Sequence, residues 1–357
     1  MIDAVREAAY RNGFQAVSVW PVGSLAHEQT LLQRWLDLGY SAGMTYLQRH
    51  AARGLDPRAL FPWARAVVVL LVRWDSLHRC QEGPWADLVA SYARGPDYHP
   101  VIMRKLGGII RELRFDKAAA QVDATALPER ALAHRAGLGW IGRNRFLIHP
   151  ELGGDLCIAE LVVDSTLQEA EPEPQIPLCG ECTACIDACP TGALTREGVD
   201  ARRCLSYHTT QNRGIIPLDL RESLTTLMGC DLCLQACPHG NAAVPVDAGA
   251  SGFLGLLLAA RTRDDFLACA GNSPVAYCKR EAAVRSAAVV AATRRRDDLV
   301  QVLGEATAGD PSPLVRGHAA WALGRLGGSA ARAVLARRHG TEPEPWVRSE
   351  IAAALEA

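Results

Sequence analysis

Residues 178–194 read LCGECTACIDACPTGAL, and this stretch brings together four cysteines, Cys179, Cys182, Cys185 and Cys189. They are separated by two, two and three residues, and Pro190 follows the fourth directly. Thiolates are strong ligands for soft metals, so four of them in so short a segment predict a cofactor site. The rest of the chain is best understood outward from this run.

The spacing C-x2-C-x2-C-x3-C-P is typical of bacterial ferredoxin-type iron–sulfur sites, in which the fourth cysteine reaches across to a second cluster. A second set of ligands is therefore expected, and Cys204 and residues 229–240 (GCDLCLQACPHG) supply it. By the crossing rule, one 4Fe-4S cluster is expected on Cys179, Cys182, Cys185 and Cys237, and the other on Cys189, Cys204, Cys230 and Cys233.

Two alternatives for these cysteines are a pair of structural zinc sites and a disulfide framework. Zinc sites rarely use this run. Disulfides conflict with a reducing compartment. The remaining cysteines, Cys80, Cys157, Cys269 and Cys278, match no ligand pattern and are expected to behave as small apolar residues.

Composition predicts an ordinary globular protein. The chain has 357 residues, 49% hydrophobic and 22% charged residues, and a net charge of -1, which argues against general attraction to nucleic acid or anionic membrane. Its first residues, MIDAVREAAYRN, lack the apolar core of a signal peptide. The apolar run at 253–260, FLGLLLAA, is far shorter than the ~20 residues of a membrane span. We therefore expect a cytoplasmic protein without a membrane partner.

The first part of the chain alternates between helical and strand patterns. Helices are expected over 27–50 and 98–113, and strands over 66–72, 118–123 and 157–164. Continuous apolar strands between helices predict an α/β layer whose sheet is covered on both faces. Residues 165–177, STLQEAEPEPQIP, then form an acidic linker that leads into the cysteines.

The C-terminal part contains a repeat. A Val-Arg pair followed by an alanine-rich helical face begins at Val284, Val315 and Val347. A period of this length indicates stacked helix pairs, as in a short HEAT-type array. The densest basic run is TRRRDD at 293–298, which fits a solvated helix face and an RNA-phosphate contact equally well.

One tempting motif is GLGWIG at 137–142, which spells the dinucleotide-binding pattern G-x-G-x-x-G. That pattern needs a strand before it and a helix after it. Here a helical stretch, PERALAHRA, precedes it and a loop-like RNRFLIHP follows. A dinucleotide site is therefore disfavoured.

Taken in order along the chain, several segments resemble one family, the epoxyqueuosine reductases. They are residues 91–106 (SYARGPDYHPVIMRKL), 122–154 (VDATALPER through HPELGG), the first cysteine run with CPTGAL, 200–217 (DARRCLSYHTTQNRGIIP) and 229–238 (GCDLCLQACP), followed by the repeats. The resemblance implies an oxidoreductase that uses cobalamin and two 4Fe-4S clusters. Its substrate would be tRNA with a queuosine-type anticodon, on which it reduces the epoxide of epoxyqueuosine at the wobble position to queuosine.

The resemblance also implies a fold: an α+β multidomain protein with three parts. Residues 1–167 would be an α/β cobalamin-binding domain related to reductive dehalogenases. Residues 168–250 would be a ferredoxin-like 4Fe-4S domain, and 251–357 a helical HEAT-like domain. A monomer and an unidentified electron donor are expected.

Specific residues follow from the same resemblance. Asp123, at the end of an expected strand, matches the family's proton donor. Without the resemblance, Asp123 would be interpreted as an aspartate that caps the following helix. Tyr98 and His99 match a segment beside the corrin, and Ser206 and Tyr207 lie where a cluster and the cofactor should approach each other. The signature D-x-H-x-x-G, which supplies histidine to cobalt elsewhere, is broken at Ile102, in keeping with this family.

The chain departs from the family pattern at a few positions. Ala124, Thr125 and Ala126 replace the usual T-G-P, Arg143 stands where lysine is common, and Gln211 where glutamate is common. Two other functions remain open: a cobalamin-dependent reductase of a small molecule, as in dehalogenases, and an electron-transfer protein that docks a partner on its repeats. The first is disfavoured because dehalogenases carry an export signal and no such array, and failure to bind cobalamin would favour the second.

Overall fold

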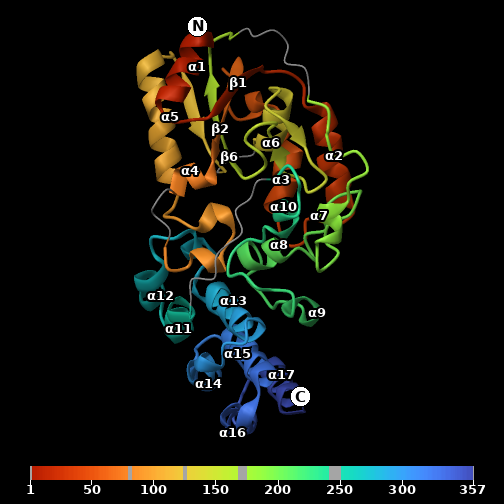
Figure 1. Cartoon of the computed structure of the whole chain (residues 1–357), viewed down its shortest axis with the longest axis vertical. Coiled ribbons are helices and arrows are strands. Elements are labelled where there is room, and N and C mark those ends of the chain that lie inside the picture. The colour runs from red at the N-terminus through yellow and green to blue at the C-terminus, as the bar shows by residue number, and fades with distance from the viewer. Residues whose placement is uncertain (1, 79–82, 124–126, 168–174, 241–250, 357) are drawn as a thin grey trace. The chain divides into compact units, whose positions relative to one another are not determined.

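The structure is a computed structural model that describes residues 2–78, 83–123, 127–167, 175–240 and 251–356 (Figure 1). The chain forms two compact units: unit 1 is Met1–Arg79, Asp97–Arg202 and Asp231–Val244, and unit 2 is Cys80–Pro96, Arg203–Cys230 and Pro245–Ala357. The segment expected as a ferredoxin-like domain is shared between the units. Its expected borders, at 168 and 250, lie outside the described residues, so the three-part division stays a prediction.

Unit 1 is built on a four-stranded sheet of order β1-β2-β6-β3, and all three neighbouring pairs are antiparallel. The strands are β1 (Ala16–Pro21), β2 (Ala66–Arg73), β3 (Ala118–Gln121) and β6 (Leu156–Val163). The strands expected over 66–72 and 157–164 are confirmed, whereas the one expected over 118–123 ends at Gln121. Apolar runs indicate burial on two faces but not strand direction, so the antiparallel pairing emerges only here.

Helices cover both faces of this sheet. On one face, Val67, Val69 and Val162 pack with Leu132 and Ala133 of α6 (Glu129–Arg135). On the other lie α1 (Ile2–Arg11) and α5 (His99–Leu113), which contact β1, β3 and each other (Figure 1). The covered α/β layer and the helix expected over 98–113 are confirmed.

The helix expected over 27–50 is two helices, α2 (Ala26–Asp37) and α3 (Tyr46–Arg53). The expectation of one continuous helix was wrong, because the backbone is left-handed at Gly39 (φ 69°) and at Ala42 (φ 48°). Left-handed residues end right-handed helices. The short elements of unit 1 are α4 (Trp74–His78), β4 (Trp140–Ile141), β5 (Leu147–Ile148), α7 (Ala184–Asp187) and α10 (Leu232–Gln235).

The GLGWIG segment ends α6 and forms β4. Gly137 has φ 74° just past the helix, and a Cβ at Gly139 would lie 2.3 Å from the Ile148 carbonyl oxygen of β5. These glycines therefore serve a helix end and a tight two-strand pairing.

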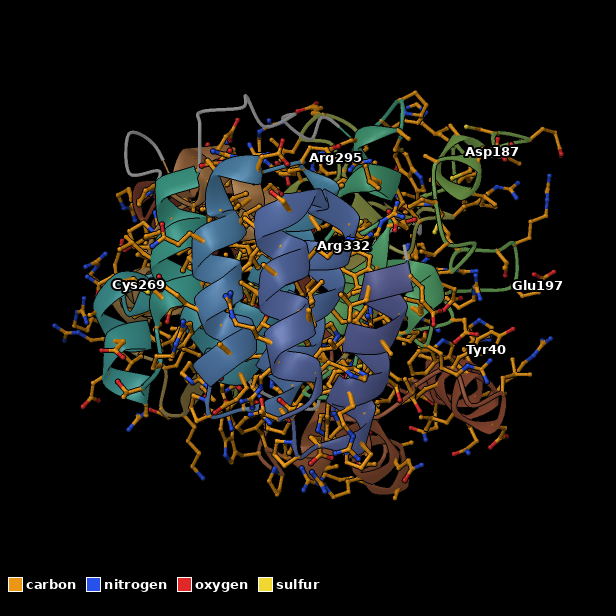
Figure 2. All side chains as sticks on the ribbon, turned by 90° about the horizontal axis from the view of Figure 1, so that it is seen from below. Tyr40, Asp187, Glu197, Cys269, Arg295 and Arg332 are labelled. Atoms are coloured by element: carbon orange, nitrogen blue, oxygen red, sulfur yellow. The ribbon has the colours of Figure 1, made fainter. Side chains whose placement is uncertain are left out.

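Unit 2 contains the helical repeat. Its helices are α8 (Leu205–Thr210), α9 (Leu218–Arg221), α11 (Ser251–Ala259), α12 (Arg263–Ala270), α13 (Arg280–Thr293), α14 (Val300–Gly309), α15 (Pro313–Leu326), α16 (Gly328–His339) and α17 (Pro345–Glu356). The three repeated valines, Val284, Val315 and Val347, are fully buried in α13, α15 and α17. Because α13 packs on α15 and α15 on α17, the repeat detected in the sequence is a stack of equivalent helices (Figure 2).

The arginine after each repeated valine binds backbone carbonyl oxygens. Arg316 donates to the carbonyl of Asp310, and Arg348 to those of Glu342 and Pro343, each in the loop before its own helix. Arg285, fully buried, donates to the carbonyl of His208, 2.6 Å away. The Val-Arg pair thus combines an apolar anchor with a guanidinium that satisfies otherwise unpaired carbonyls.

Within the described ranges, no helix combines the length and the apolar character that crossing a bilayer requires.

The α15–α17 contact depends on a glycine, because a Cβ at Gly324 would lie 2.7 Å from the Cβ of Ala354. We expect Gly324→Ala to lower the free energy of unfolding by about 1 kcal/mol or more, since overpacking outweighs the gain in helix propensity. Urea unfolding followed by far-UV circular dichroism measures this.

The control is Gly309→Ala, at the exposed end of α14, where an added Cβ meets no atom within 4 Å. It should be neutral or stabilising. Equal stability of the two variants would show that α15 and α17 do not pack this closely.

Candidate functional site

Asp123 lies two residues beyond β3, at the carboxyl end of that strand. Its backbone is left-handed, with φ 50°, a conformation that is costly for a residue with a side chain. The side chain is 42% exposed. The sheet therefore ends by presenting a carboxyl group toward solvent in a constrained position.

Two predicted residues meet this carboxyl. The Tyr98 hydroxyl donates a hydrogen bond to Asp123 Oδ2, and His99 Nε2 lies 3.9 Å from the same oxygen. The His99 ring stacks on Tyr98 with centroids 4.3 Å apart, and its Nδ1 lies 2.7 Å from Asp97 Oδ1. Trp74 packs edge-on against Tyr98. The structure thus brings Tyr98, His99 and Asp123 together in unit 1.

Two further carboxyl groups that the sequence patterns did not single out, Glu129 and Glu160, lie in the same part of unit 1. Glu129, the first residue of α6, accepts a hydrogen bond from the Asp123 backbone N–H at 2.6 Å. Glu160, in the middle of β6, is completely buried. A signal for Glu160 was present: a glutamate inside the apolar run CIAELVVD is rarely buried without a reason.

The first cysteine set surrounds one cavity of unit 1. Cys179, Cys182 and Cys185, at the start of α7, face Cys237, which follows α10; Arg143, Asn144, Pro238 and His239 are among the other lining residues. The Cys182 N–H donates to the Cys179 carbonyl, and the Asn144 amide donates to the carbonyl of Cys233. These are the four residues that the crossing rule grouped together. Their role as ligands remains a prediction.

Chemistry supports a multi-atom cluster in this cavity. Burial, and then the neighbouring thiols, raise the pKa of Cys185 and of Cys237. The four cysteines around this cavity would therefore be deprotonated together only if a positively charged metal centre lay between them. Within the described ranges, no three His, Cys, Asp or Glu side chains are close enough together to hold a single metal ion. Sulfurs arranged around a space fit a 4Fe-4S cluster, whose irons each take one cysteine.

The second set is divided between the units: Cys189 and Cys233 belong to unit 1, and Cys204 and Cys230 to unit 2. In unit 2, the Thr209 hydroxyl accepts from the N–H of Gly229, which ties α8 to the residue before Cys230. Cys204 directly precedes α8, and Ser206 and Tyr207 lie in its first turn. That these residues serve a cluster and a cofactor stays a prediction.

The positions that depart from the family pattern have structural settings of their own. Arg143 donates to the carbonyl of Gly180, between two of the clustered cysteines, and Gln211 reaches the Tyr277 hydroxyl at 3.5 Å. Ala124, Thr125 and Ala126 lie outside the described residues.

The basic run at 293–298 is largely engaged within unit 2. Arg294 donates to the carbonyl of Asp87, and Arg296 pairs with Asp298. Arg295 is exposed (Figure 2) and donates to the carbonyl of Arg325 at 2.9 Å. All three arginines therefore make contacts within unit 2.

Of the other cysteines, Cys157 and Cys278 are buried and Cys269 is half-buried, as small apolar residues are expected to be. Cys80 lies outside the described residues.

A helix-covered sheet with an acid at its edge, two four-cysteine sets and a helical repeat define a redox iron–sulfur protein with a repeat platform. Comparison with known domains gives the same parts. A 4Fe-4S double cluster binding domain matches residues 178–240, HEAT repeats match 276–356, and a domain described as epoxyqueuosine reductase QueG, DUF1730, matches 55–126.

Whole-chain relatives agree. An epoxyqueuosine reductase of Pseudomonas aeruginosa is 32% identical over 350 residues, covering 92% of this chain and 95% of its own. One from Synechococcus sp. (strain CC9605) is 41% identical and covers 68% of this chain and 77% of its own. The solved structure of an epoxyqueuosine reductase with an epoxyqueuosine-modified tRNA-Tyr stem loop superimposes with a TM-score of 0.86 at 26% identity, covering 99% of this chain and 98% of that one. The chain belongs to the epoxyqueuosine reductase family.

The cysteine assignment predicts about eight irons per chain in anaerobically prepared protein, because two four-iron clusters are expected. Cys185→Ser removes a ligand of the first cavity and should reduce the content to about four. Iron analysis with electron paramagnetic resonance measures both values.

Cys269→Ser, at a half-buried cysteine outside both sets, is the matched control and should keep the full content. Zinc in place of iron in the unmodified protein would overturn the assignment.

Proposed function

We propose that this protein is an epoxyqueuosine reductase, which reduces the epoxide of epoxyqueuosine at the wobble position of tRNA to the alkene of queuosine. The observation that supports this most is the similarity over 99% of the chain to an epoxyqueuosine reductase that was solved with a modified tRNA stem loop. The side chains of Asp123, Tyr98 and His99 provide acid groups and hydrogen bonds suited to that reaction. A tRNA substrate places the protein in the cytoplasm, where it would act as a monomer.

The reaction removes one oxygen as water, so it consumes two electrons and two protons. A proton donor must stand beside the departing oxygen. Asp123 fits this role because it is at the open edge of the sheet and its position is fixed by backbone and side-chain contacts. The hydrogen bond from Tyr98 to Oδ2 holds the Asp123 carboxyl group at the edge of the sheet.

The groups around Asp123 also fit a bound cobalamin. Members of the family hold cobalt without a protein histidine, and here both nitrogens of His99 face carboxylates, Asp97 and Asp123. Tyr98 and His99 would contact the corrin, and we propose the same role for Ser206 and Tyr207. When bound, the cofactor supplies a reducible centre for the epoxide, and the clusters supply single electrons from a donor yet to be identified.

Asp123→Asn tests the acid. The amide still accepts the hydrogen bond from Tyr98 but has no acidic proton, so turnover should fall at least 100-fold, in the range typical for loss of general acid catalysis. The assay is anaerobic conversion of epoxyqueuosine-bearing tRNA, scored by loss of one oxygen mass after nuclease digestion.

Clusters, cobalamin and tRNA affinity should be retained in this variant. The control is Asp116→Asn, an exposed aspartate just before β3 in the same unit, which should convert normally. Normal turnover of Asp123→Asn would remove Asp123 from the mechanism. No conversion by unmodified protein that holds both clusters and cobalamin would overturn the proposed function itself.

The helical repeat is proposed as the tRNA platform. Residues 279–357 contain 12 Lys or Arg against 9 Asp or Glu. Truncation near Cys278 would not test this cleanly, because α13 lies in the core of unit 2 and binds the carbonyls of His208 and Leu224. Surface arginines are the better target. Arg332 and Arg337 are exposed on α16, where Arg332 is labelled in Figure 2.

Arg332→Glu combined with Arg337→Glu should weaken tRNA binding and lower the salt slope of the binding constant by about one per lost phosphate contact. Binding isotherms at several salt concentrations measure this. The matched pair Arg49→Glu and Arg53→Glu, exposed on α3 in unit 1, should leave affinity unchanged. Equal affinity of both double variants would exclude α16 from the platform.

A further inference from the structure

Three carboxyl groups of unit 1 form a series of increasing burial. Asp123 is 42% exposed, Glu129 is half-buried at the start of α6, and Glu160 is completely buried on β6. The Asp123 backbone N–H donates to Glu129 Oε1, 2.6 Å away. This bond holds the Glu129 carboxyl group against the backbone of Asp123.

The strand register places Glu160 behind this pair. Glu160 is opposite Val69 of β2 and Gln121 of β3, so it belongs to the sheet face that α6 covers. Glu129 begins that helix. The three carboxyls are therefore arranged from the core to the edge of the sheet by two paired strands and one helix.

Glu160 is also unsatisfied. Within the described ranges, neither of its carboxylate oxygens has a hydrogen-bond partner. Burial of an ionised carboxylate without a partner is very unfavourable, so Glu160 holds its proton. Glu160 is thus a buried acid on the sheet face that α6 covers, at a position that an apolar residue would fill more stably.

The surroundings favour protonation of Glu129 as well. Burial and then the charge of Asp123 raise the pKa of Glu129 to about 8, while Arg130 acts in the opposite direction. Burial raises the pKa of Glu160, and burial also raises that of Cys157 on the same strand. At neutral pH, Glu129 and Glu160 therefore both carry protons.

We propose that Glu129 donates the second proton of the reaction to the Asp123 carboxylate. Glu160 is a second protonated carboxyl group, further inside the unit, that can resupply this pair. The inference rests on the proposed function, because only that reaction needs two protons at one oxygen. Asp123 gives its proton to the epoxide oxygen as the first C–O bond breaks, which leaves a hydroxyl group. The proton of Glu129 then passes to the Asp123 carboxylate.

Asp123 protonates the hydroxyl as the second C–O bond breaks, and water leaves. The two electrons come from the reducing centres of the proposed function. Asp123 and Glu129 each regain one proton from solvent once product has left. One exposed acid and its half-buried neighbour thereby deliver both protons to the same oxygen.

Glu129→Gln is the test, because the amide oxygen still accepts the Asp123 N–H but holds no acidic proton. In the holoenzyme we expect single-turnover conversion of epoxyqueuosine-bearing tRNA to slow at least tenfold. The single-turnover rate of the unmodified protein should fall as the pH rises through about 8, where Glu129 ionises. The rate of the variant should not show this decrease. Glu129→Asp, which restores an acid, should recover part of the rate and its decrease with pH.

Infrared difference spectra of the resting protein give a readout that does not depend on turnover. Two buried protonated carboxyl bands are expected; Glu129→Gln should remove the one that titrates near pH 8, and Glu160→Gln the other. Glu151→Gln, an exposed glutamate of the same unit, is the matched control for both measurements.

The outcomes separate the two proposals. If the unmodified protein converts tRNA but Glu129→Gln keeps its rate and its pH profile, the relay is wrong and the proposed function stands. If the unmodified protein converts no tRNA, the proposed function fails. Absence of a titrating acid band near pH 8 would overturn the relay on its own.

Discussion

The pairing of β2 with β6 is the constraint on which unit 1 depends. Eight residue pairs in antiparallel register, from Ala66 opposite Val163 to Arg73 opposite Leu156, give strands that are buried on both faces. Because side chains alternate between faces, this register determines which residues α6 covers and which face α1 and α5. It also aligns β3 on the outer side of β6, so that the chain leaves the sheet at Asp123. A shift of one residue would turn Glu160 away from Glu129.

Function is accommodated in this layer at a cost in stability. Asp123 adopts a left-handed backbone, and Glu160 replaces an apolar residue in the core. Each feature is unfavourable by itself, and each is sustained by the apolar contacts around it. The clustered thiols follow the same logic, since burial and then the neighbouring thiols raise the pKa of Cys185, and a metal centre would offset this. Local destabilisation coincides with the proposed chemistry in both places.

Unit 2 is subject to a different constraint, because the backbone carbonyl groups in the short loops between its stacked helices need hydrogen-bond donors. The Val-Arg pair provides them repeatedly, with valine in the core and arginine on carbonyl oxygens. Close contacts between helices then require small residues, as at Gly324 against Ala354, and at Gly317 beneath the Trp346 ring. Buried ion pairs such as Arg221 with Glu350 add directional contacts between distant segments. The unit is thus organised by guanidinium groups as much as by apolar packing.

The sequence by itself determined the features that are local along the chain. The spacing of Cys179, Cys182 and Cys185, the periodicity of α5 and the recurrence of Val284, Val315 and Val347 all depend on near neighbours, and they were predictable for that reason. Only the tertiary structure decided the antiparallel order of the sheet and the contact of Arg294 with the distant carbonyl of Asp87. It alone placed Glu129 and Glu160 beside Asp123. These features arise from residues far apart in sequence, and a carboxyl group's proton affinity depends on burial and neighbouring charge, which exist only once the strands and α6 have packed.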